Sequence, residues 1–168
     1  MNFFGKDGIA HSEKSIEWET PQELFNDLNK EFDFTIDVCA TKENAKCKRF
    51  YNKQTNGLAQ SWENEIVFMN PPYGRTINKW IEKAYNEFLK GAVVVCLIPA
   101  RTDTSYWHDY IFPNAEVRFL KGRIKFLNSG EKVKYIEQLV LFEENESEMV
   151  CCEGSLSAPF PSAVVIFK

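Results

Sequence analysis

The stretch that decides the fold is Ile66-Val67-Phe68-Met69-Asn70-Pro71-Pro72-Tyr73-Gly74, near the middle of the 168-residue chain. Four apolar residues in a row predict a buried strand, and the two prolines that follow cannot continue a sheet ladder. The strand therefore delivers residues 70–73 to an exposed loop at its carboxyl end. In open α/β sheets, ligands bind along that edge.

This loop carries an unusual set of hydrogen-bonding groups. Asn70 has a side-chain carbonyl, and Pro71 and Pro72 lack an N–H, so their backbone groups act only as acceptors. Tyr73 adds a flat ring. Acceptors beside an aromatic face suit a planar molecule that carries an NH2 group, and an adenine base fits that description.

The composition is that of one globular domain spanning residues 1–168. The chain is 44% hydrophobic and 26% charged, which is ordinary for a soluble protein, and its length allows a substantial core. No basic region followed by an apolar run opens the sequence, and the longest apolar run, residues 93–100, is too short to cross a bilayer. We therefore expect a cytoplasmic protein with no membrane partner.

Cysteine, histidine and charge limit the classes of site. The five cysteines are odd in number and none has C-x-x-C spacing, and there are only two histidines, so we predict reduced thiols and no metal site. The net charge of −4 does not indicate a nucleic-acid binder. It does not exclude one, because basic residues can gather on one face.

The flanking segments predict a parallel sheet. Residues 77–88 carry apolar residues at helical spacing, and residues 92–100 form a second apolar strand. A strand–helix–strand unit of this kind implies a parallel pair with a right-handed crossover.

The amino-terminal half predicts one helix and one strand. Thr20 is expected as the N-cap, Pro21 as the first helical residue and Glu23 as the third position of a capping box. Residues 32–40 alternate and predict a strand that brings Asp37 to its carboxyl end, where a carboxylate can accept hydrogen bonds from a ligand. The Thr20-Pro21 turn either marks only the start of a helix or lines a cofactor pocket, and Asp37 is either a ligand contact or a solvated turn residue.

Several basic residues could contact a phosphate backbone. Residues 42–53 interleave cations with aromatic rings and contain Lys46 and Arg49. Residues 116–126 predict a basic strand–turn–strand that contains Arg123, and Arg101 follows the strand at 92–100. The alternative for each is a solvated surface. Residues 105–111 predict a short helix whose His108 is structural.

The remaining segments complete the domain. Residues 1 to about 15 are expected to form a flexible tail, and residues about 128–157 an inserted hairpin or loop with an acidic tip. Residues 162–167 predict a closing strand.

The loop at residues 70–73 after an apolar strand resembles motif IV of the S-adenosylmethionine-dependent amino methyltransferases, which act on adenine in DNA, on bases in RNA and on glutamine in proteins. More of the chain resembles the phage-type DNA N6-adenine methyltransferases (the Dam family). The stretches that carry this narrower resemblance include Thr20-Pro21, Phe34-Thr35-Ile36-Asp37, Leu97-Ile98-Pro99-Ala100-Arg101-Thr102, Gly122-Arg123-Ile124 and Ala158-Pro159-Phe160-Pro161-Ser162.

The resemblance implies a Rossmann-like methyltransferase fold. Its sheet is expected to be mostly parallel with an antiparallel C-terminal hairpin, and abbreviated between the first and the catalytic strands. The implied reaction moves a methyl group from S-adenosylmethionine to N6 of a flipped-out adenine in DNA by direct displacement. The rivals are methylation of an RNA base or a protein glutamine amide, and a non-catalytic nucleic-acid-binding module.

The resemblance also implies roles for individual residues. The expected catalytic residues are Asn70, Pro71, Pro72 and Tyr73; the expected cofactor-binding residues are Thr20, Pro21, Asp37, Cys39 and Ala40; and the candidate DNA contacts are Lys46, Arg49, Arg101 and Arg123. One departure from the family pattern is the missing glycine-rich motif, where Cys39-Ala40-Thr41-Lys42 stands instead. The acid for the ribose hydroxyls is therefore unassigned, with Glu43 as a candidate.

Overall fold

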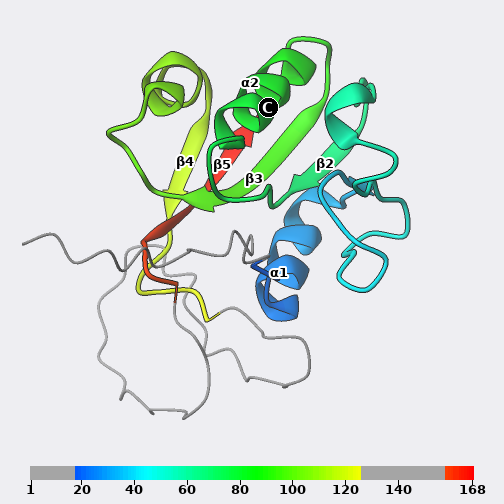
Figure 1. Ribbon diagram of the computed structural model, residues 1–168, viewed down its shortest axis with the longest axis horizontal. Helices are drawn as coiled ribbons and strands as arrows, with labels where there is room; N and C mark the ends of the chain where they lie inside the picture. Colours follow the sequence, from blue (N-terminus) through cyan, green and yellow to red (C-terminus); the bar gives the residue numbers. More distant parts are fainter. Residues whose placement is uncertain (1–17, 126–157) are drawn as a thin grey trace, which may run out of the picture.

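The computed structural model describes residues 18–125 and 158–168, whose arrangement is shown in Figure 1. The predicted tail at residues 1–15 and the predicted insertion at residues 128–157 lie outside the described residues.

A five-stranded sheet forms the centre of the fold. Its strands are β1 (Ile36–Asp37), β2 (Ile66–Met69), β3 (Val93–Pro99), β4 (Glu116–Phe119) and β5 (Ser162–Phe167), in the order β1-β2-β3-β5-β4. β1, β2 and β3 are parallel, and β5 is antiparallel to both β3 and β4. The structure thus confirms a mixed α/β fold in which every strand except β5 runs in the same direction.

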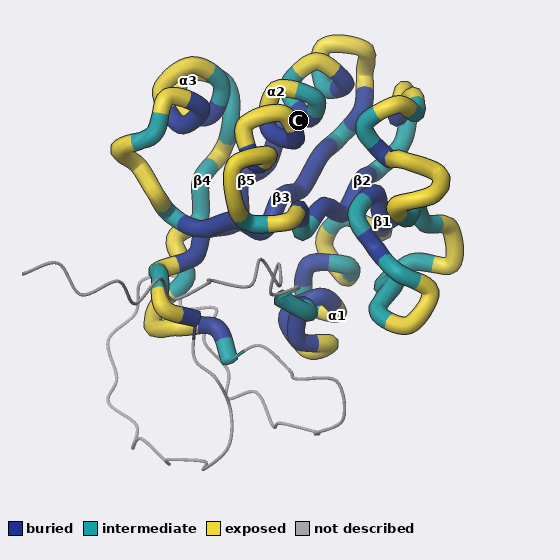
Figure 2. The backbone as a smooth tube through the Cα atoms, viewed as in Figure 1, coloured by how far each residue is buried: buried dark blue, intermediate teal, exposed yellow. Residues whose placement is uncertain are grey.

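Helices cover both faces of the sheet. α1 (Gln22–Phe32) packs on one face, while α2 (Ile77–Phe88), the π-helical turn η2 (Trp107–Ile111) and the short α3 (Phe112–Asn114) lie on the other side. A short 3-10 turn, η1 (Gly57–Ala59), precedes β2. The central strands are almost wholly buried, whereas the connecting loops are exposed (Figure 2).

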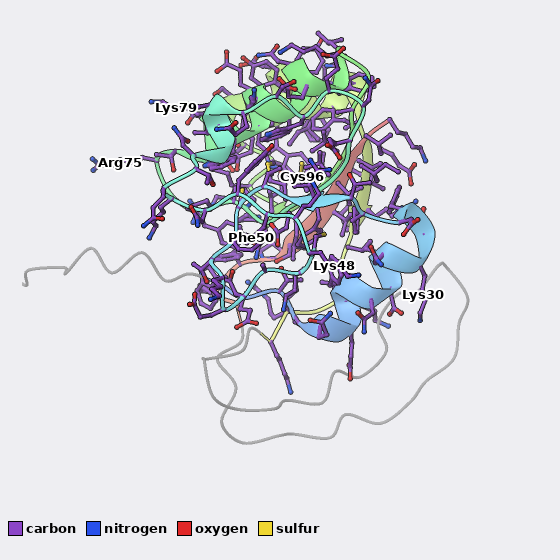
Figure 3. The ribbon with its side chains drawn as sticks, turned by 90° about the vertical axis from the view of Figure 1, so that its right-hand side faces the viewer. Lys30, Lys48, Phe50, Arg75, Lys79 and Cys96 are labelled. Carbon is purple, nitrogen blue, oxygen red and sulfur yellow. The ribbon has the colours of Figure 1, made fainter. Side chains whose placement is uncertain are left out.

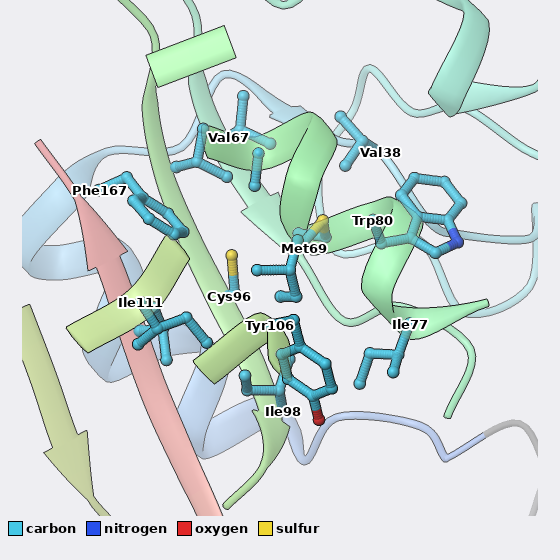
Figure 4. Packing of buried hydrophobic residues seen from close by; sticks show 14 of the residues in the cluster. Val38, Val67, Met69, Ile77, Trp80, Cys96, Ile98, Tyr106, Ile111 and Phe167 are labelled. Atoms are coloured by element: carbon cyan, nitrogen blue, oxygen red, sulfur yellow. The ribbon is translucent and has the colours of Figure 1, made fainter. Parts of the chain in front are cut away.

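Alternation along the strands separates the core into two layers. Phe68 points toward α1 and packs with Phe25 and Phe34, whose ring centroids lie 5.1 and 5.4 Å from its own. Its neighbours Val67 and Met69 point toward α2, where the apolar side chains interdigitate (Figure 4). Successive strand residues face opposite sides of a sheet, so burial on both faces explains the unbroken apolar run.

The predicted boundaries in the amino-terminal half need correction. Thr20 is not the N-cap: α1 begins at Gln22, and Pro21 is the N-cap, with ψ of 136° and no side-chain capping bond. The Thr20 hydroxyl instead accepts a hydrogen bond from Asn70. The predicted strand at 32–40 shortens to β1 because α1 continues to Phe32 and Asp33 ends it in a left-handed conformation, with φ of 54°.

The predicted strand–turn–strand at 116–126 is confirmed only in its first half. β4 ends at Phe119, and no further strand is assigned in the part described up to residue 125. Gly122 turns the chain with φ of 80°, and the Ile124 carbonyl accepts a hydrogen bond from the Ala158 amide. The turn therefore places Ile124 in the core beneath α1. The short helix predicted at residues 105–111 is present as η2.

No helix within residues 18–125 and 158–168 has the length and apolar character required to cross a membrane.

Candidate active site

A cavity of about 240 Å³ opens at the carboxyl ends of β1 and β2. Three segments meet there: residues 18–20 before α1, the loop after β1, and the loop after β2. The predicted site residues that line it are Thr20, Asp37, Cys39, Ala40, Lys46, Asn70, Pro71, Pro72 and Tyr73. The structure therefore brings the expected cofactor-binding and catalytic residues together, while Pro21 lies just outside this lining as the N-cap of α1.

The side chain of Asn70 is held in one orientation. Its Nδ2 donates to the Trp18 carbonyl at 2.7 Å and to Thr20 Oγ1 at 2.9 Å. A backbone carbonyl is only an acceptor, so the amide NH2 group must face Trp18 and the Oδ1 atom must face away from it. This arrangement fixes Asn70 Oδ1 as the acceptor end of the amide.

The Tyr73 hydroxyl supports the same orientation. It lies 2.8 Å from Asn70 Oδ1 and 3.3 Å from the Leu97 carbonyl, and can donate to either. Burial raises the pKa of the Tyr73 phenol, so it remains a protonated donor at neutral pH. The Tyr73 ring meets Phe160 edge-on at 5.4 Å between centroids, and Phe160 meets Trp18 edge-on at 5.9 Å.

Asp37 organises the loop after β1. Its carboxylate is 3% exposed; Oδ1 accepts the Cys39 amide at 3.2 Å, and Oδ2 accepts the Lys46 amide at 3.1 Å. Burial raises the pKa of Asp37, and these two hydrogen bonds act against the rise. Both carboxylate oxygens thus hold the backbone of the loop that lines the cavity. The sequence predicted only a contact with a ligand for this residue.

Gly57 allows a close approach on the other side of the cavity. A Cβ atom at this position would overlap the Val38 carbonyl oxygen and lie 3.3 Å from the Trp80 ring. The preceding Asn56 adopts a left-handed conformation with φ of 50°, as expected for an Asn-Gly turn. Only glycine therefore fits between this turn and the end of β1.

The four candidate DNA contacts occupy different environments. Lys46 has a side chain only 7% exposed and pairs with Glu19 at 3.2 Å. Arg49 pairs with Glu65 at 2.8 Å, beside the amino end of β2 and so at the opposite edge from Asn70. Arg101 and Arg123 are exposed and follow β3 and β4 at the edge that carries Asn70.

The chain matches the family of DNA N-6-adenine-methyltransferases (Dam) over residues 9–150. This chain belongs to the Dam family. It is 31% identical over 147 residues to the DNA N-6-adenine-methyltransferase of Haemophilus phage HP1 (strain HP1c1), a match that covers 82% of this chain and 84% of that protein. It is 28% identical over 137 residues to the DNA N-6-adenine-methyltransferase of Escherichia phage T1, which covers 71% of this chain and 57% of that protein. The resemblance inferred from the sequence is confirmed.

Two residues of this Dam-family site, Trp18 and Phe160, were not predicted from the sequence. Trp18 takes part through its backbone carbonyl, which no side-chain pattern reveals, and Phe160 arrives from the far end of the chain. The phenylalanine lies in a stretch that carries the family resemblance, which was the only signal for it. Glu43, the candidate for the ribose hydroxyls, is not among the residues that line the cavity.

The buried cysteines and the acidic and histidine side chains bear on the thiol and metal predictions within the described part of the chain. Burial raises the pKa of the Cys39 and Cys96 thiols, which disfavours the nucleophilic thiolate. Among residues 18–125 and 158–168, no three His, Cys, Asp or Glu side chains gather into a group that could hold a metal ion.

Proposed function

We propose that this Dam-family protein transfers a methyl group from S-adenosylmethionine to N6 of adenine in DNA. Family membership supports the reaction class, and the relatives named for it come from phages. The observation that carries the proposal is Asn70 Oδ1, which is held as the acceptor end of its amide beside Pro71, in a cavity shared with Thr20 and Asp37. The DNA substrate is expected in the cytoplasm of the host cell.

The lining of the cavity suits S-adenosylmethionine chemically. The carboxylates of Glu19 and Asp37 complement the cationic sulfonium and ammonium groups, and the Tyr51 and Trp80 rings offer flat apolar surface. When bound, this cofactor supplies the methyl group for transfer. We propose that Asp37, Cys39 and Ala40 form its side of the cavity, while the Thr20 hydroxyl in the same lining contacts Asn70.

The chain's own contribution to the reaction is to activate the nucleophile. The lone pair on adenine N6 is delocalised into the ring and is a poor nucleophile. Asn70 Oδ1 has a second lone pair beyond the one that faces Tyr73, and with the Pro71 carbonyl it can accept the two N6 hydrogens. These hydrogen bonds strengthen as positive charge develops on nitrogen, so they stabilise the transition state more than the ground state.

The target base must leave the duplex to reach these acceptors. We propose that the Tyr73 ring then stacks on the adenine, a contact worth about 1–3 kcal/mol, while its hydroxyl holds Asn70. Placing both reactants in one cavity also removes much of the entropic barrier to their encounter.

In the deciding experiment, the purified protein is incubated with labelled S-adenosylmethionine in three separate reactions, which contain DNA, RNA or protein as the substrate. We expect label in DNA at adenine N6, and none after Asn70→Ala, whereas cofactor affinity measured by calorimetry stays near that of wild type. Asn26→Ala, at an exposed asparagine on α1, is the matched control and should retain activity. Label only in RNA or protein would overturn the proposed substrate, and an active Asn70→Ala would overturn the mechanism.

A further inference from the structure

A second cavity, of about 340 Å³, adjoins the first at Tyr73, which lines both cavities. It is formed where β3 ends and α2 begins. The polar side chains that line it, apart from Tyr73, are Arg75, Asn78, Arg101, Thr104, Ser105 and Tyr106. Neither the family match nor the proposed reaction assigns this second cavity a role.

The second cavity favours an anion. Two arginines and several residues with neutral donor groups line it, and no carboxylate is among its lining residues. By contrast, the first cavity is lined by the carboxylates Glu19 and Asp37 as well as by Lys46 and Lys53. The amino terminus of α2 also lies here, and Thr76, its N-cap, makes no side-chain capping bond. The amides of a first helical turn lack intrahelical acceptors, and the helix dipole favours negative charge beside them.

The arginines of the chain divide by location. Arg49 and Arg118 each hold a carboxylate, at 2.8 Å from Glu65 and 2.6 Å from Glu31. Arg75 and Arg101 are exposed, and among the described residues neither forms an ion pair with an acid. Arg123 is exposed at the edge of the sheet that carries Asn70, whereas Arg75 and Arg101 line the second cavity and leave two guanidinium groups available there.

Tyr106 supplies the independent observation. Its side chain is 5% exposed, yet its hydroxyl has no hydrogen-bond partner in the described part of the chain. Figure 4 shows its ring between Ile77 and Ile98, with the hydroxyl at the end turned away from Cys96. A buried hydroxyl without a partner destabilises the fold, and an acceptor bound in the cavity that Tyr106 lines would remove this cost.

We propose that the second cavity binds a backbone phosphate of the DNA strand that carries the target adenine, next to the flipped nucleotide. This inference rests on the proposed function, because the first cavity must hold the base. Since Tyr73 lines both cavities, a base in one and the adjoining phosphate in the other can belong to one strand. A phosphodiester offers the negative charge and the acceptor oxygens that Arg75, Arg101 and Tyr106 require. Such a contact fixes the register of the strand and reads no sequence.

The first test removes the charges one at a time. In Arg75→Gln and Arg101→Gln, we expect the Kd for DNA to rise on the order of tenfold at low salt, and the slope of log K against log salt to fall by about 0.9 for each lost contact. The affinity for S-adenosylmethionine should stay unchanged. Lys30→Gln is the matched control, because Lys30 lies in the last turn of α1, on the opposite side of the molecule from Arg75 in Figure 3.

The second test removes a single oxygen atom. Tyr106→Phe should leave the melting temperature of the free protein equal or higher, because the hydroxyl has no partner in the described structure. The same variant should weaken DNA binding by about two- to tenfold, the effect of one hydrogen bond. A lower melting temperature with wild-type DNA affinity would show that the hydroxyl serves the fold and would overturn its assigned role.

The third test neutralises the phosphate itself. DNA sequencing of cells that express the protein gives the methylated site, and duplexes are then made with one methylphosphonate on either side of the target adenine. Wild-type protein should bind one of the two methylphosphonate duplexes more weakly than the unmodified duplex. The double variant Arg75→Gln/Arg101→Gln should bind that methylphosphonate duplex and the unmodified duplex with equal affinity. Full additivity of the two losses, or wild-type behaviour of the arginine variants, would overturn the phosphate site. A wild-type protein that transfers no methyl group to DNA would overturn the proposed function instead.

Discussion

Asn70 Nδ2 donates a hydrogen bond of 2.9 Å to Thr20 Oγ1, a residue 50 positions earlier in the chain. This contact joins the entry of α1 to the loop after β2. The sequence placed Thr20 in a helix cap and in the cofactor half of the site. The structure shows that its hydroxyl meets Asn70 in the loop after β2, so we predict that Thr20 positions Asn70.

Thr20→Val tests this positioning role. Valine keeps the shape of threonine and removes the hydroxyl, which leaves the Trp18 carbonyl as the remaining acceptor for Asn70 Nδ2. A lost hydrogen bond costs about 0.5–1.5 kcal/mol, so we expect kcat for DNA methylation to fall by about two- to tenfold. Calorimetry should give an unchanged Kd for S-adenosylmethionine.

Thr20→Ser is the control for this variant, because it retains the hydroxyl and should retain kcat. If Thr20 contacts the cofactor instead, the result reverses: Thr20→Val raises the cofactor Kd and leaves kcat at saturation intact. The split between kcat and Kd therefore distinguishes the two roles.

Tyr73→Phe separates the two tasks assigned to the tyrosine. Phenylalanine keeps the ring for base stacking and for the edge-on contact with Phe160, but removes the donor to Asn70 Oδ1. We expect kcat to fall by about two- to tenfold, which is the effect expected from the loss of one hydrogen bond. The KM for DNA should stay unchanged. Tyr73→Ala should in addition raise that KM. Equal kinetics for the two variants would mean that the ring does not contact the base.

The sequence was sufficient for the strands that are buried on both faces. The strands β2 and β3 and the helix α2 were predicted correctly. Burial on both faces requires an unbroken run of apolar residues in a strand, and burial of one helical face requires apolar residues at helical spacing. β1 is different. Its two residues pair with β2 while Asp33 ends α1 only three residues earlier. No local sequence pattern shows where β1 begins and ends, because its boundaries depend on pairing with β2, which lies about 30 residues later in the chain.

The site was predictable where its chemistry resides in side chains of one stretch. Residues 70–73 were found as a loop of acceptors, and the structure places them at the cavity. The fixed orientation of Asn70 was not predictable, because it depends on the backbone carbonyl of Trp18. Lys46 and Arg49 were candidates because cations alternate with aromatic rings in residues 42–53, and the structure pairs each with an acid that is distant in sequence.

Gly57→Ala tests the close approach beside the cavity. The added methyl group would overlap the Val38 carbonyl oxygen, so the turn must move away from the end of β1. Overpacking of this kind costs about 1–3 kcal/mol, and in a domain of this size each kcal/mol lowers Tm by about 2–4 °C. We expect a lower Tm in thermal unfolding, together with weaker binding of S-adenosylmethionine.

Ala59→Ser, at an exposed position in the same turn, is the control and should leave both measurements unchanged. Normal Tm and normal cofactor affinity in Gly57→Ala would show that this turn adapts without cost.

Glu87 should make folding stability depend on pH in the acid range. This fully buried carboxylate accepts hydrogen bonds from the Trp62 amide at 2.6 Å and from Lys83 and Lys90 at 2.8 Å each. Burial alone raises the pKa of Glu87, but these hydrogen bonds outweigh it and hold the pKa at about 2, below the usual 4.5. The stabilisation is therefore complete above pH 4.5 and is lost as the pH falls toward 2.

Glu87→Gln measures that contribution. One pKa unit corresponds to about 1.4 kcal/mol, so the difference in unfolding free energy between wild type and variant should shrink by about 3 kcal/mol between pH 7 and pH 2. Urea unfolding at a series of pH values gives this difference directly, with exposed Glu63→Gln as the control. A difference that stays constant with pH would show that Glu87 is not held as a low-pKa carboxylate, and that the two lysines contribute nothing to the fold through it.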